Sequence, residues 1–344
     1  MRARLTGAIL ILGIAAISVM LWLNSELSTP YYGALNDETF VEIPRGAKTS
    51  EIASLLAGAG IIKNRFAFIG YARWKNLSGR LQAGEYRFTA PATPVQVMER
   101  IVHGDVFFVS LTIPEGLTAH ETVELIADAH FGRLAQLQAA LTHTEWIEDL
   151  NPSAQTLEGY LFPETYRFPR RASSEEVIKT MNDQFRARVK KLVKIHPLPR
   201  NLSLAQVVTL ASLIGKEAKS LEERPLIGSV LVNRLALGMP LACDPTIIYA
   251  LKLAGKYDGN IRKTDLDIDS PYNTYIHAGL PPGPICNPGE ESLRAALAPV
   301  KTDYLYFVAR NDGTHQFSKD FHAHSLAVSR FQKPLGTKRS TAKK

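Results

Sequence analysis

The sequence predicts an α+β protein with an N-terminal transmembrane helix, a small β-α-α-β domain and a larger, mainly helical region with short strands. Three observations predict this fold. An uncharged apolar run opens the chain, two strand-like segments with helical patterns between them follow, and helix-period patterns dominate the remainder. The 344 residues suggest two or three domains and suffice to bury a sizeable core.

The first element is the apolar run Leu5–Leu23, which Arg2 and Arg4 precede. As a helix it would be about 28 Å long, close to the roughly 30 Å hydrocarbon core of a bilayer. It is too long for a cleaved signal h-region of about 7–15 residues, and no small-x-small cleavage site precedes Asn24. Residues 1–24 are therefore predicted to be a single-pass signal anchor in the cytoplasmic (inner) membrane. The arginines place the N-terminus inside and the rest of the chain outside. A cleaved signal peptide is the alternative and leaves the compartment unchanged.

A polar, Pro- and Gly-containing segment, 25–37, is predicted to be a linker, and a small domain is expected at 38–105. The pattern of this domain resembles a LysM-like glycan-binding unit; a structural spacer domain is the alternative. Its predicted elements, in order, are a strand at 41–43, helices at 49–56 and 65–74, a strand at 84–88 and a helix at 94–102.

The motif of the first strand recurs about seventy residues later. VEIPRG at 41–46 and LTIPEG at 111–116 each lead into an amphipathic helix, which predicts two β-α units of related design. The second unit opens an intermediate α/β region, 106–200, whose helices surround a non-helical island at 157–169. At the far end of the chain, residues 333–344 carry five positive charges without apolar periodicity and are predicted to be a disordered basic tail.

A helix at Leu204–Ala218 carries the candidate catalyst. It is apolar nearly all round and is therefore expected to be buried. Glu217 follows Leu210, Leu213 and Ile214 at helical spacing, so it should stack on them, lose hydration and have a raised pKa. A glutamate of that kind can donate a proton near neutral pH. The alternative, a glutamate at an exposed helix end paired with Lys216 or Lys219, is equally compatible with the spacing.

Two further helices and a shaped loop follow. Helices are predicted at Pro225–Leu237 and Asp244–Gly255, with Asp244 as the N-cap of the second. The Pro- and Gly-rich stretch 271–289 predicts a rigid loop. A buried strand is expected at 304–308, and Asn311-Asp312-Gly313 should turn it into a second strand at 315–317.

Three segments resemble the endolytic murein transglycosylase (MltG/YceG-like) family. They are ASLIGKEAKSLEERPLIGSVLVNRLALGMPLACDPTIIYAL, SPYNTYIHAGLPPGPICNPGEESLRAAL and YLYFVARNDGTHQF. The segment LEGYLFPETYRF at 157–168 and the anchor also agree. The resemblance covers about 38–332 and implies a catalytic domain at 201–332. In that family the catalytic glutamate closes an A-S-x-x-E-K-E motif, which maps onto Glu217. This chain has Gly215 at the first acidic position, a departure that matters only if that other glutamate were the catalyst.

The resemblance implies cleavage of the MurNAc–GlcNAc bond of peptidoglycan strands, with 1,6-anhydroMurNAc ends as products. The attacking hydroxyl belongs to the substrate itself, so one acid/base glutamate suffices. The resemblance also implies termination of nascent strands, with peptidoglycan synthases as partners. Two alternatives remain: a non-catalytic glycan-binding scaffold, and a two-carboxylate hydrolase that pairs Glu217 with Glu158 or Glu164.

Supporting site residues are also predicted by the resemblance, although each alone is more often a cap or a core residue. The predicted substrate-binding residues are Asn233, Asp244, Thr246, Tyr249, Asn273 and Tyr275, with Glu158, Tyr160 and Glu164 on the island as walls of the groove.

No cofactor, metal or nucleic-acid partner is expected. The net charge of +7 suits anionic polymers or lipid headgroups, but zinc-finger spacings, RNP motifs and phosphate-cradling loops are missing from the sequence. A solvated surface with a basic tail accounts for the charge more simply. His315 and His324 are expected to bridge loops by hydrogen bonds. Cys243 and Cys286 are hypothesised to form a disulfide worth roughly 4 kcal/mol, because an exported chain tolerates oxidation; two free buried thiols are the alternative.

Overall fold

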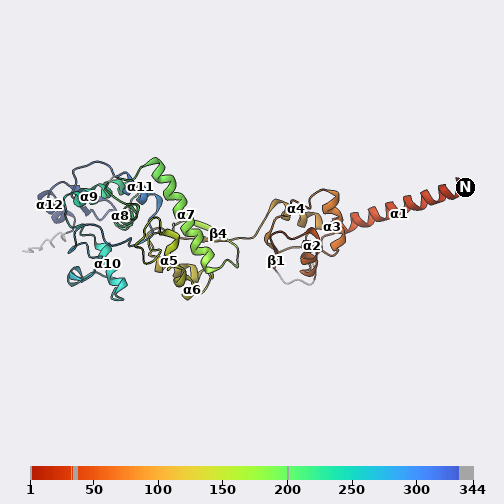
Figure 1. The fold of residues 1–344 in the computed structure, drawn as a ribbon, viewed down its shortest axis with the longest axis horizontal. Coiled ribbons are helices and arrows are strands. Elements are labelled where there is room, and N and C mark those ends of the chain that lie inside the picture. The colour runs from red at the N-terminus through yellow and green to blue at the C-terminus, as the bar shows by residue number, and fades with distance from the viewer. Residues whose placement is uncertain (1, 32, 34–37, 200, 333–344) are drawn as a thin grey trace, which may run out of the picture. The chain divides into compact units, whose positions relative to one another are not determined.

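A computed structural model describes residues 2–31, 33, 38–199 and 201–332 (Figure 1). The predicted basic tail at 333–344 and much of the predicted linker lie outside the described residues. The chain divides into two compact units, Met1–Ser110 with Arg167–Arg171, and Leu111–Tyr166 with Ala172–Lys344. The regions 106–200 and 201–332, predicted to be separate, fall largely within the second unit.

Helix α1, Arg2–Ser28, opens the first unit. Among the described residues it is the one helix long and apolar enough to cross a membrane, over Leu10–Ser28. The helix continues to Ser28, whereas the linker was predicted to begin at residue 25. The reason is local: the Thr29 backbone N–H donates to the Ser25 carbonyl at 3.1 Å and its hydroxyl donates to the same carbonyl at 2.7 Å, which satisfies a group of the last turn.

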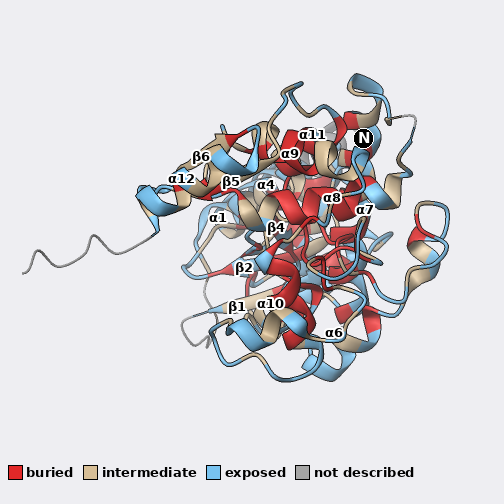
Figure 2. Cartoon of the chain, turned by 90° about the vertical axis from the view of Figure 1, so that its left-hand side faces the viewer, coloured by how far each residue is buried: buried red, intermediate tan, exposed pale blue. Residues whose placement is uncertain are grey.

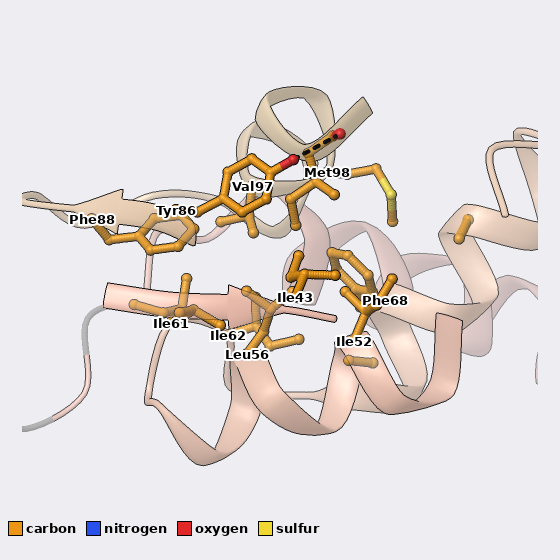
Figure 3. Packing of buried hydrophobic residues seen from close by; sticks show 14 residues of the cluster. Ile43, Ile52, Leu56, Ile61, Ile62, Phe68, Tyr86, Phe88, Val97 and Met98 are labelled. Atoms are coloured by element: carbon orange, nitrogen blue, oxygen red, sulfur yellow. Dashed lines mark hydrogen bonds between the residues drawn. The ribbon is translucent and has the colours of Figure 1, made fainter. Parts of the chain in front are cut away.

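The remainder of the first unit follows the predicted β-α-α-β order, with a helix after it. Strand β1 pairs antiparallel with β2, with Val41 opposite Tyr86. The core between sheet and helices includes Ile43, Phe68, Tyr86 and Met98, and the Tyr86 hydroxyl donates to the Ile101 carbonyl at 3.3 Å (Figure 3). The bounds are β1 Thr39–Ile43, α2 Thr49–Gly58, α3 Arg65–Trp74, β2 Gly84–Phe88 and α4 Pro94–His103.

The helix ends of this unit are set by local chemistry. Asn64 caps α3 by accepting the Phe66 backbone N–H at 2.9 Å. Thr93 forms a capping box with Gln96 at the start of α4, and Gly104 ends that helix in the left-handed conformation. These signals explain why the sequence predicted both helices to within a residue or so.

The second unit is mainly helical and contains the short strand pair β5 with β6; strands β3 and β4, which pair with each other, have residues in both units. The mixed α+β class predicted from the sequence is therefore confirmed. From residue 109 on, the elements are β3 Val109–Thr112, α5 Ala119–Asp128, α6 Leu134–Ala140, η1 Thr144–Ile147, β4 Thr165–Phe168, α7 Ser174–Ile195, α8 Leu204–Glu217, α9 Arg224–Ala236, α10 Asp244–Leu253, η2 Lys263–Asp267, α11 Glu290–Leu297, β5 Tyr306–Ala309, β6 His315–Ser318 and α12 Phe321–Phe331.

Helix α8 is the centre of this unit. It packs against α9, α10 and α11, and Val207–Ile214 are all buried (Figure 2). A capping box between Ser203 and Gln206 begins the helix. The predicted buried helix is confirmed, and its last residue is Glu217.

The strand predicted at 304–308 is shorter and more exposed than expected. It runs Tyr306–Ala309, and Val308 alone of its four residues is buried. The Asn233 side-chain amide donates to the carbonyls of Thr302 and Tyr304, at 2.8 and 2.9 Å. The segment before β5 is therefore held by a side chain. The predicted turn and partner strand are confirmed, since β5 pairs antiparallel with β6.

Candidate active site

The carboxyl group of Glu217 lies at a cavity of about 400 Å³ in the second unit. The cavity is formed by the end of α8, by α9, by the start of α10 and by the β5–β6 hairpin with α12. Its lining residues are Glu217, Arg234, Leu241, Ala242, Asp244, Tyr275, Phe307, Val308, Ala309, His315, His324, Val328 and Gln332.

Burial, and to a smaller extent the nearby negative charge of Asp244, raise the pKa of Glu217 to about 7. A hydrogen bond with the Cys243 thiol and the positive charge of Arg234 oppose the rise. A carboxyl group with a pKa near 7 is partly protonated at neutral pH and can both give and take a proton. The desolvated glutamate predicted from helical spacing is therefore confirmed, and the pairing with Lys216 or Lys219 is not formed: the Lys216 ammonium bonds instead to the Gly116 carbonyl.

Asp244 holds the rim of the cavity together with Tyr275, whose hydroxyl donates to the Asp244 carboxylate. The prediction that Asp244 is the N-cap of α10 is wrong. Cys243 occupies the cap position, no side chain caps the helix, and Asp244 is the first helical residue. Its carboxylate bonds to the phenol instead, so it faces the cavity and Glu217.

Arg234 supplies the cationic side of the site. Its guanidinium donates to the Leu305 carbonyl at 2.7 Å and to the Leu241 carbonyl at 2.8 Å, and it lies over the Tyr306 ring at 5.1 Å. These partners are neutral backbone groups and a ring, so the charge is not cancelled by a carboxylate. It offsets part of the negative potential of Glu217 and Asp244.

His315 brings an imidazole ring to the same cavity. Its backbone N–H and ring Nδ1 bond to the two oxygens of Glu223, at 2.8 and 2.7 Å. Because Nδ1 is committed to the carboxylate, the tautomer and orientation of the ring are fixed. His324 stacks on Tyr306 at 5.1 Å, and burial lowers its pKa. The bridging hydrogen bond predicted for His315 is confirmed, whereas the Nδ1 atom of His324, predicted to do the same, has no hydrogen-bond partner among the described residues.

A buried hydroxyl pair positions Cys243, the neighbour of Glu217. The Thr246 hydroxyl donates to the Cys243 carbonyl at 2.7 Å and lies 2.9 Å from the Thr274 hydroxyl, which accepts the Cys243 backbone N–H at 3.0 Å. Asn273 supports the same loop, because its amide donates to the Leu266 and Ile268 carbonyls at 2.8 and 2.9 Å. Thr246 and Asn273 are fully buried, so the structure places them beneath the site and away from the cavity surface.

The island residues predicted to line the groove lie apart from the lining of this cavity. Both oxygens of Glu158 accept the Ala119 backbone N–H, at 3.0 and 3.1 Å, and the Tyr249 hydroxyl donates to it at 3.3 Å. Burial raises the pKa of Glu158 to about 8. Tyr160 is fully buried against Phe185.

Glu164 and Asn233 also have structural partners. Glu164 pairs with Arg188 at 3.0 Å, and the Arg188 guanidinium also reaches Glu290 at 3.2 Å. Asn233 lines a separate cavity with Ser229 and Pro281. Neither residue lines the Glu217 cavity, and substrate binding by them stays a prediction.

Asn287 ties the island to the Pro- and Gly-rich loop. Its side-chain carbonyl accepts the Leu161 backbone N–H at 3.1 Å, its amide donates to the Thr122 hydroxyl at 3.2 Å, and its own N–H donates to the Leu117 carbonyl at 2.8 Å. A buried side chain and backbone that hydrogen-bond to three residues outside the loop make the loop rigid. The predicted rigid loop therefore has a physical cause.

Gly215, the departure from the family motif, faces α11. A Cβ added there would lie 3.0 Å from the Ser292 hydroxyl, whose oxygen has no partner among the described residues. An acid at this position would point into the contact between α8 and α11. The departure consequently leaves the cavity at Glu217 unchanged.

The disulfide hypothesis is wrong, because Cys243 and Cys286 are both free and buried. The Cys286 thiol donates to the Ser212 carbonyl at 3.4 Å, and the Cys243 thiol donates to the Leu241 carbonyl at 3.7 Å. Each thiol therefore has a backbone carbonyl, and not the other sulfur, as its partner. Within the described part of the chain, no cluster of three metal-ligating side chains occurs either.

Comparison with known proteins gives consistent matches. A family model described as the YceG-like family matches residues 41–330. An endolytic murein transglycosylase from Bacillus subtilis (strain 168) is 37% identical over 307 residues, covering 85% of this chain and 84% of that protein. An endolytic murein transglycosylase from Streptococcus pneumoniae (strain R6) is 31% identical and covers 78% of this chain; the chain spans 54% of that longer protein. The crystal structure of a putative yceG-like protein from Listeria monocytogenes has a TM-score of 0.56 at 32% identity, covering 84% of this chain and 98% of that one.

Proposed function

Because the chain belongs to the YceG-like family, we propose that it is a lytic transglycosylase that cleaves the glycan strands of peptidoglycan, with Glu217 as the acid/base catalyst. The observation that carries the proposal is the environment of Glu217. Its carboxyl group has a pKa of about 7 and lies at a cavity that also presents a carboxylate, a phenol, a guanidinium and an imidazole. That set can bind the hydroxyl and amide groups of amino sugars.

The proposed reaction uses Glu217 twice. Protonated Glu217 donates its proton to the oxygen of the MurNAc–GlcNAc bond as the bond from that oxygen to the muramyl anomeric carbon breaks. The muramyl C6 hydroxyl attacks the same carbon, and the Glu217 carboxylate takes its proton. One proton leaves Glu217 and one returns, so no water is consumed. A pKa near 7 makes both half-steps accessible at neutral pH.

The neighbours of Glu217 have supporting roles in this proposal. Asp244, held by Tyr275, keeps the pKa of Glu217 high and stabilises positive charge that develops at the anomeric carbon. Arg234 and His315 line the same cavity and would hold substrate oxygens. Tyr249, Thr246 and Asn273 act through the loops that they position.

In the alternative function, a two-carboxylate hydrolase, the second carboxylate has to be a different residue from those predicted. Glu158 and Glu164 are outside the lining of the cavity, and the carboxylate that does share it with Glu217 is Asp244. A hydrolase reading would therefore make Asp244 the base that activates water. The two reactions differ in their products, since hydrolysis leaves reducing ends and transglycosylation leaves anhydro ends.

The first unit would hold the enzyme at its substrate. We propose that α1 is the membrane anchor, with its N-terminus in the cytoplasm and the chain beyond α1 outside, and that residues 38–105 form a LysM-like glycan-binding domain. An enzyme anchored in this way would act on strands close to the membrane, where termination of nascent strands and contact with peptidoglycan synthases take place.

Mass spectrometry of the products tests the proposal. Purified glycan strands are incubated with the full-length chain in detergent, as wild type, Glu217→Gln and the exposed control Glu148→Gln. We expect internal fragments with anhydro-muramyl ends from wild type and control, and none from Glu217→Gln. Reducing ends would establish a hydrolase. No cleavage by any of the three proteins, with strand binding intact, would establish the scaffold.

A further inference from the structure

Helix α3 presents an apolar and cationic face that the first unit leaves uncovered. Trp74 is 73% exposed and Phe66 is 67% exposed, although large aromatic side chains are normally buried. With Gly70 they recur every four residues, so they lie along one face of the helix. The buried residues of α3, Ala67, Phe68 and Ala72, point into the core from the other face. This α3 face (Phe66, Gly70, Trp74) therefore has no partner within the unit's core.

The same face lies beside the outer end of α1. Gly70, Tyr71 and Trp74 line an apolar groove of about 400 Å³ together with α1 side chains. The α1 residues in this groove are Val19, Met20, Leu23, Asn24 and Leu27. Lys63, just before α3, also pairs with Glu26 of α1 at 3.5 Å. The position of the α3 face is thereby tied to a defined level of the apolar helix.

That level coincides with the surface of a membrane. If the run Leu5–Leu23 spans the bilayer, Leu23 marks the outer limit of the hydrocarbon, and Val19 lies about 6 Å inside it. Trp74 lines the same groove as Val19 and Leu23. Tryptophan is enriched at this interface because its ring is apolar and its N–H is polar.

The charges around the α3 face suit lipid headgroups. Lys63, Arg65, Arg73 and Lys75 are all exposed. The Lys75 ammonium lies 4.2 Å from the Trp74 ring centre, and the Arg65 guanidinium lies 4.8 Å from that of Phe66. Cations beside interfacial aromatic rings can reach phosphate groups while the rings enter the acyl region.

We propose that the α3 face docks the first unit onto the outer surface of the membrane and binds anionic phospholipids. The docking holds the unit next to the bilayer, in addition to the tether that α1 provides. This inference rests on the proposed membrane anchor, so its test must report on the anchor and on the α3 face separately.

Tryptophan quenching by brominated lipids separates the two. The chain has three tryptophans, at positions 22, 74 and 146, so two Trp→Phe substitutions leave one reporter. The full-length chain is reconstituted in vesicles of phosphatidylcholine and phosphatidylglycerol, with and without bromine on the acyl chains. We expect at least twofold quenching of Trp22 and of Trp74. A control with Phe108→Trp in the background without other tryptophans places a reporter where the chain leaves the first unit, and little quenching is expected there.

Each result decides between the possibilities. Quenching of Trp22 without quenching of Trp74 would overturn the docking and leave the anchor intact. Quenching of neither would overturn the anchor and the docking together. Equal quenching of Trp74 and of the reporter at position 108 would overturn the docking alone, because the α3 face would then have no preferred orientation toward the bilayer.

Charge substitutions test the lipid class. Arg65→Gln with Lys75→Gln should abolish the extra Trp74 quenching that phosphatidylglycerol gives over phosphatidylcholine alone. The matched control Lys191→Gln with Lys194→Gln removes the same charge from exposed positions on α7 and should keep that difference. The same loss in both variants, or none in the first, would refute binding of anionic lipid by the α3 face.

Discussion

Replacement of Glu217 by Gln should inactivate the enzyme and stabilise its second unit at alkaline pH. The carboxyl group has a pKa of about 7 in the folded chain and 4.5 as its ordinary value, because folding removes water from it. The folded state therefore keeps the proton while the unfolded state loses it. Folding stability falls as pH rises from about 4.5 to about 7, and glutamine, which carries no proton to lose, escapes this loss.

The magnitude follows from the size of the shift. A rise from 4.5 to about 7 corresponds to about 3 kcal/mol once both states are ionised. Between pH 5 and pH 8 the stability difference between variant and wild type should grow by about 2–3 kcal/mol in favour of the variant. The pKa of Glu158 is also raised, to about 8, but Glu158 is present in both proteins and cancels from the difference. Cleavage should fall by about 10²–10⁴-fold.

Denaturant unfolding of the second unit provides the assay. Trp146 is the single tryptophan of that unit, so Trp22→Phe and Trp74→Phe make fluorescence specific to it. Free energies of unfolding are measured at pH 5 and pH 8 for this background, for its Glu217→Gln form and for the exposed control Glu148→Gln. The control should show no comparable growth with pH.

A stability difference that is the same at both pH values would refute the reasoning. So would a variant that becomes less stable relative to wild type at pH 8, since that would mean that the fold stabilises the ionised carboxylate. An active Glu217→Gln enzyme would refute the catalytic assignment independently of the stability result.

Three further predictions follow from other contacts. Asp244→Asn removes a negative charge that raises the pKa of Glu217, so the alkaline limb of the kcat/KM–pH profile should move to lower pH; an unmoved limb would contradict the coupling. Gly159→Ala should destabilise the chain by about 2–4 kcal/mol in thermal unfolding, because φ is +85° and a Cβ would lie 2.4 Å from a proline carbon, whereas Gly238→Ala, at φ +64° in open space, should cost about 1 kcal/mol. Thiol titration of the unfolded, unreduced chain should find two thiols, and a count that rises on reduction would restore the disulfide.

Local signals in the sequence determined most of the secondary structure. The helix predicted at 65–74 has these bounds in the structure, where Asn64 caps it and its apolar residues recur at helical spacing. Helix α8 was predicted to within one residue for the same reasons, and Glu217 was identified from its spacing and from the resemblance of its motif. These features depend on neighbours within a turn or two of the chain, so the sequence contains their physical cause.

Only the tertiary structure decided which side chains share the cavity with Glu217. Arg234 and His315 come from segments far apart in the sequence, and their spacing carried no signal of a shared site. The sequence around Asp244 predicted a helix cap, yet its carboxylate accepts a hydrogen bond from the hydroxyl of Tyr275, on another loop.

The two thiols show the same limit. Cys243 donates to the Leu241 carbonyl and Cys286 to the Ser212 carbonyl, and the sequence alone does not reveal these partners. Helix ends are fixed by short-range backbone hydrogen bonds, whereas a site is fixed by long-range packing, and for this reason the first could be predicted and the second could not.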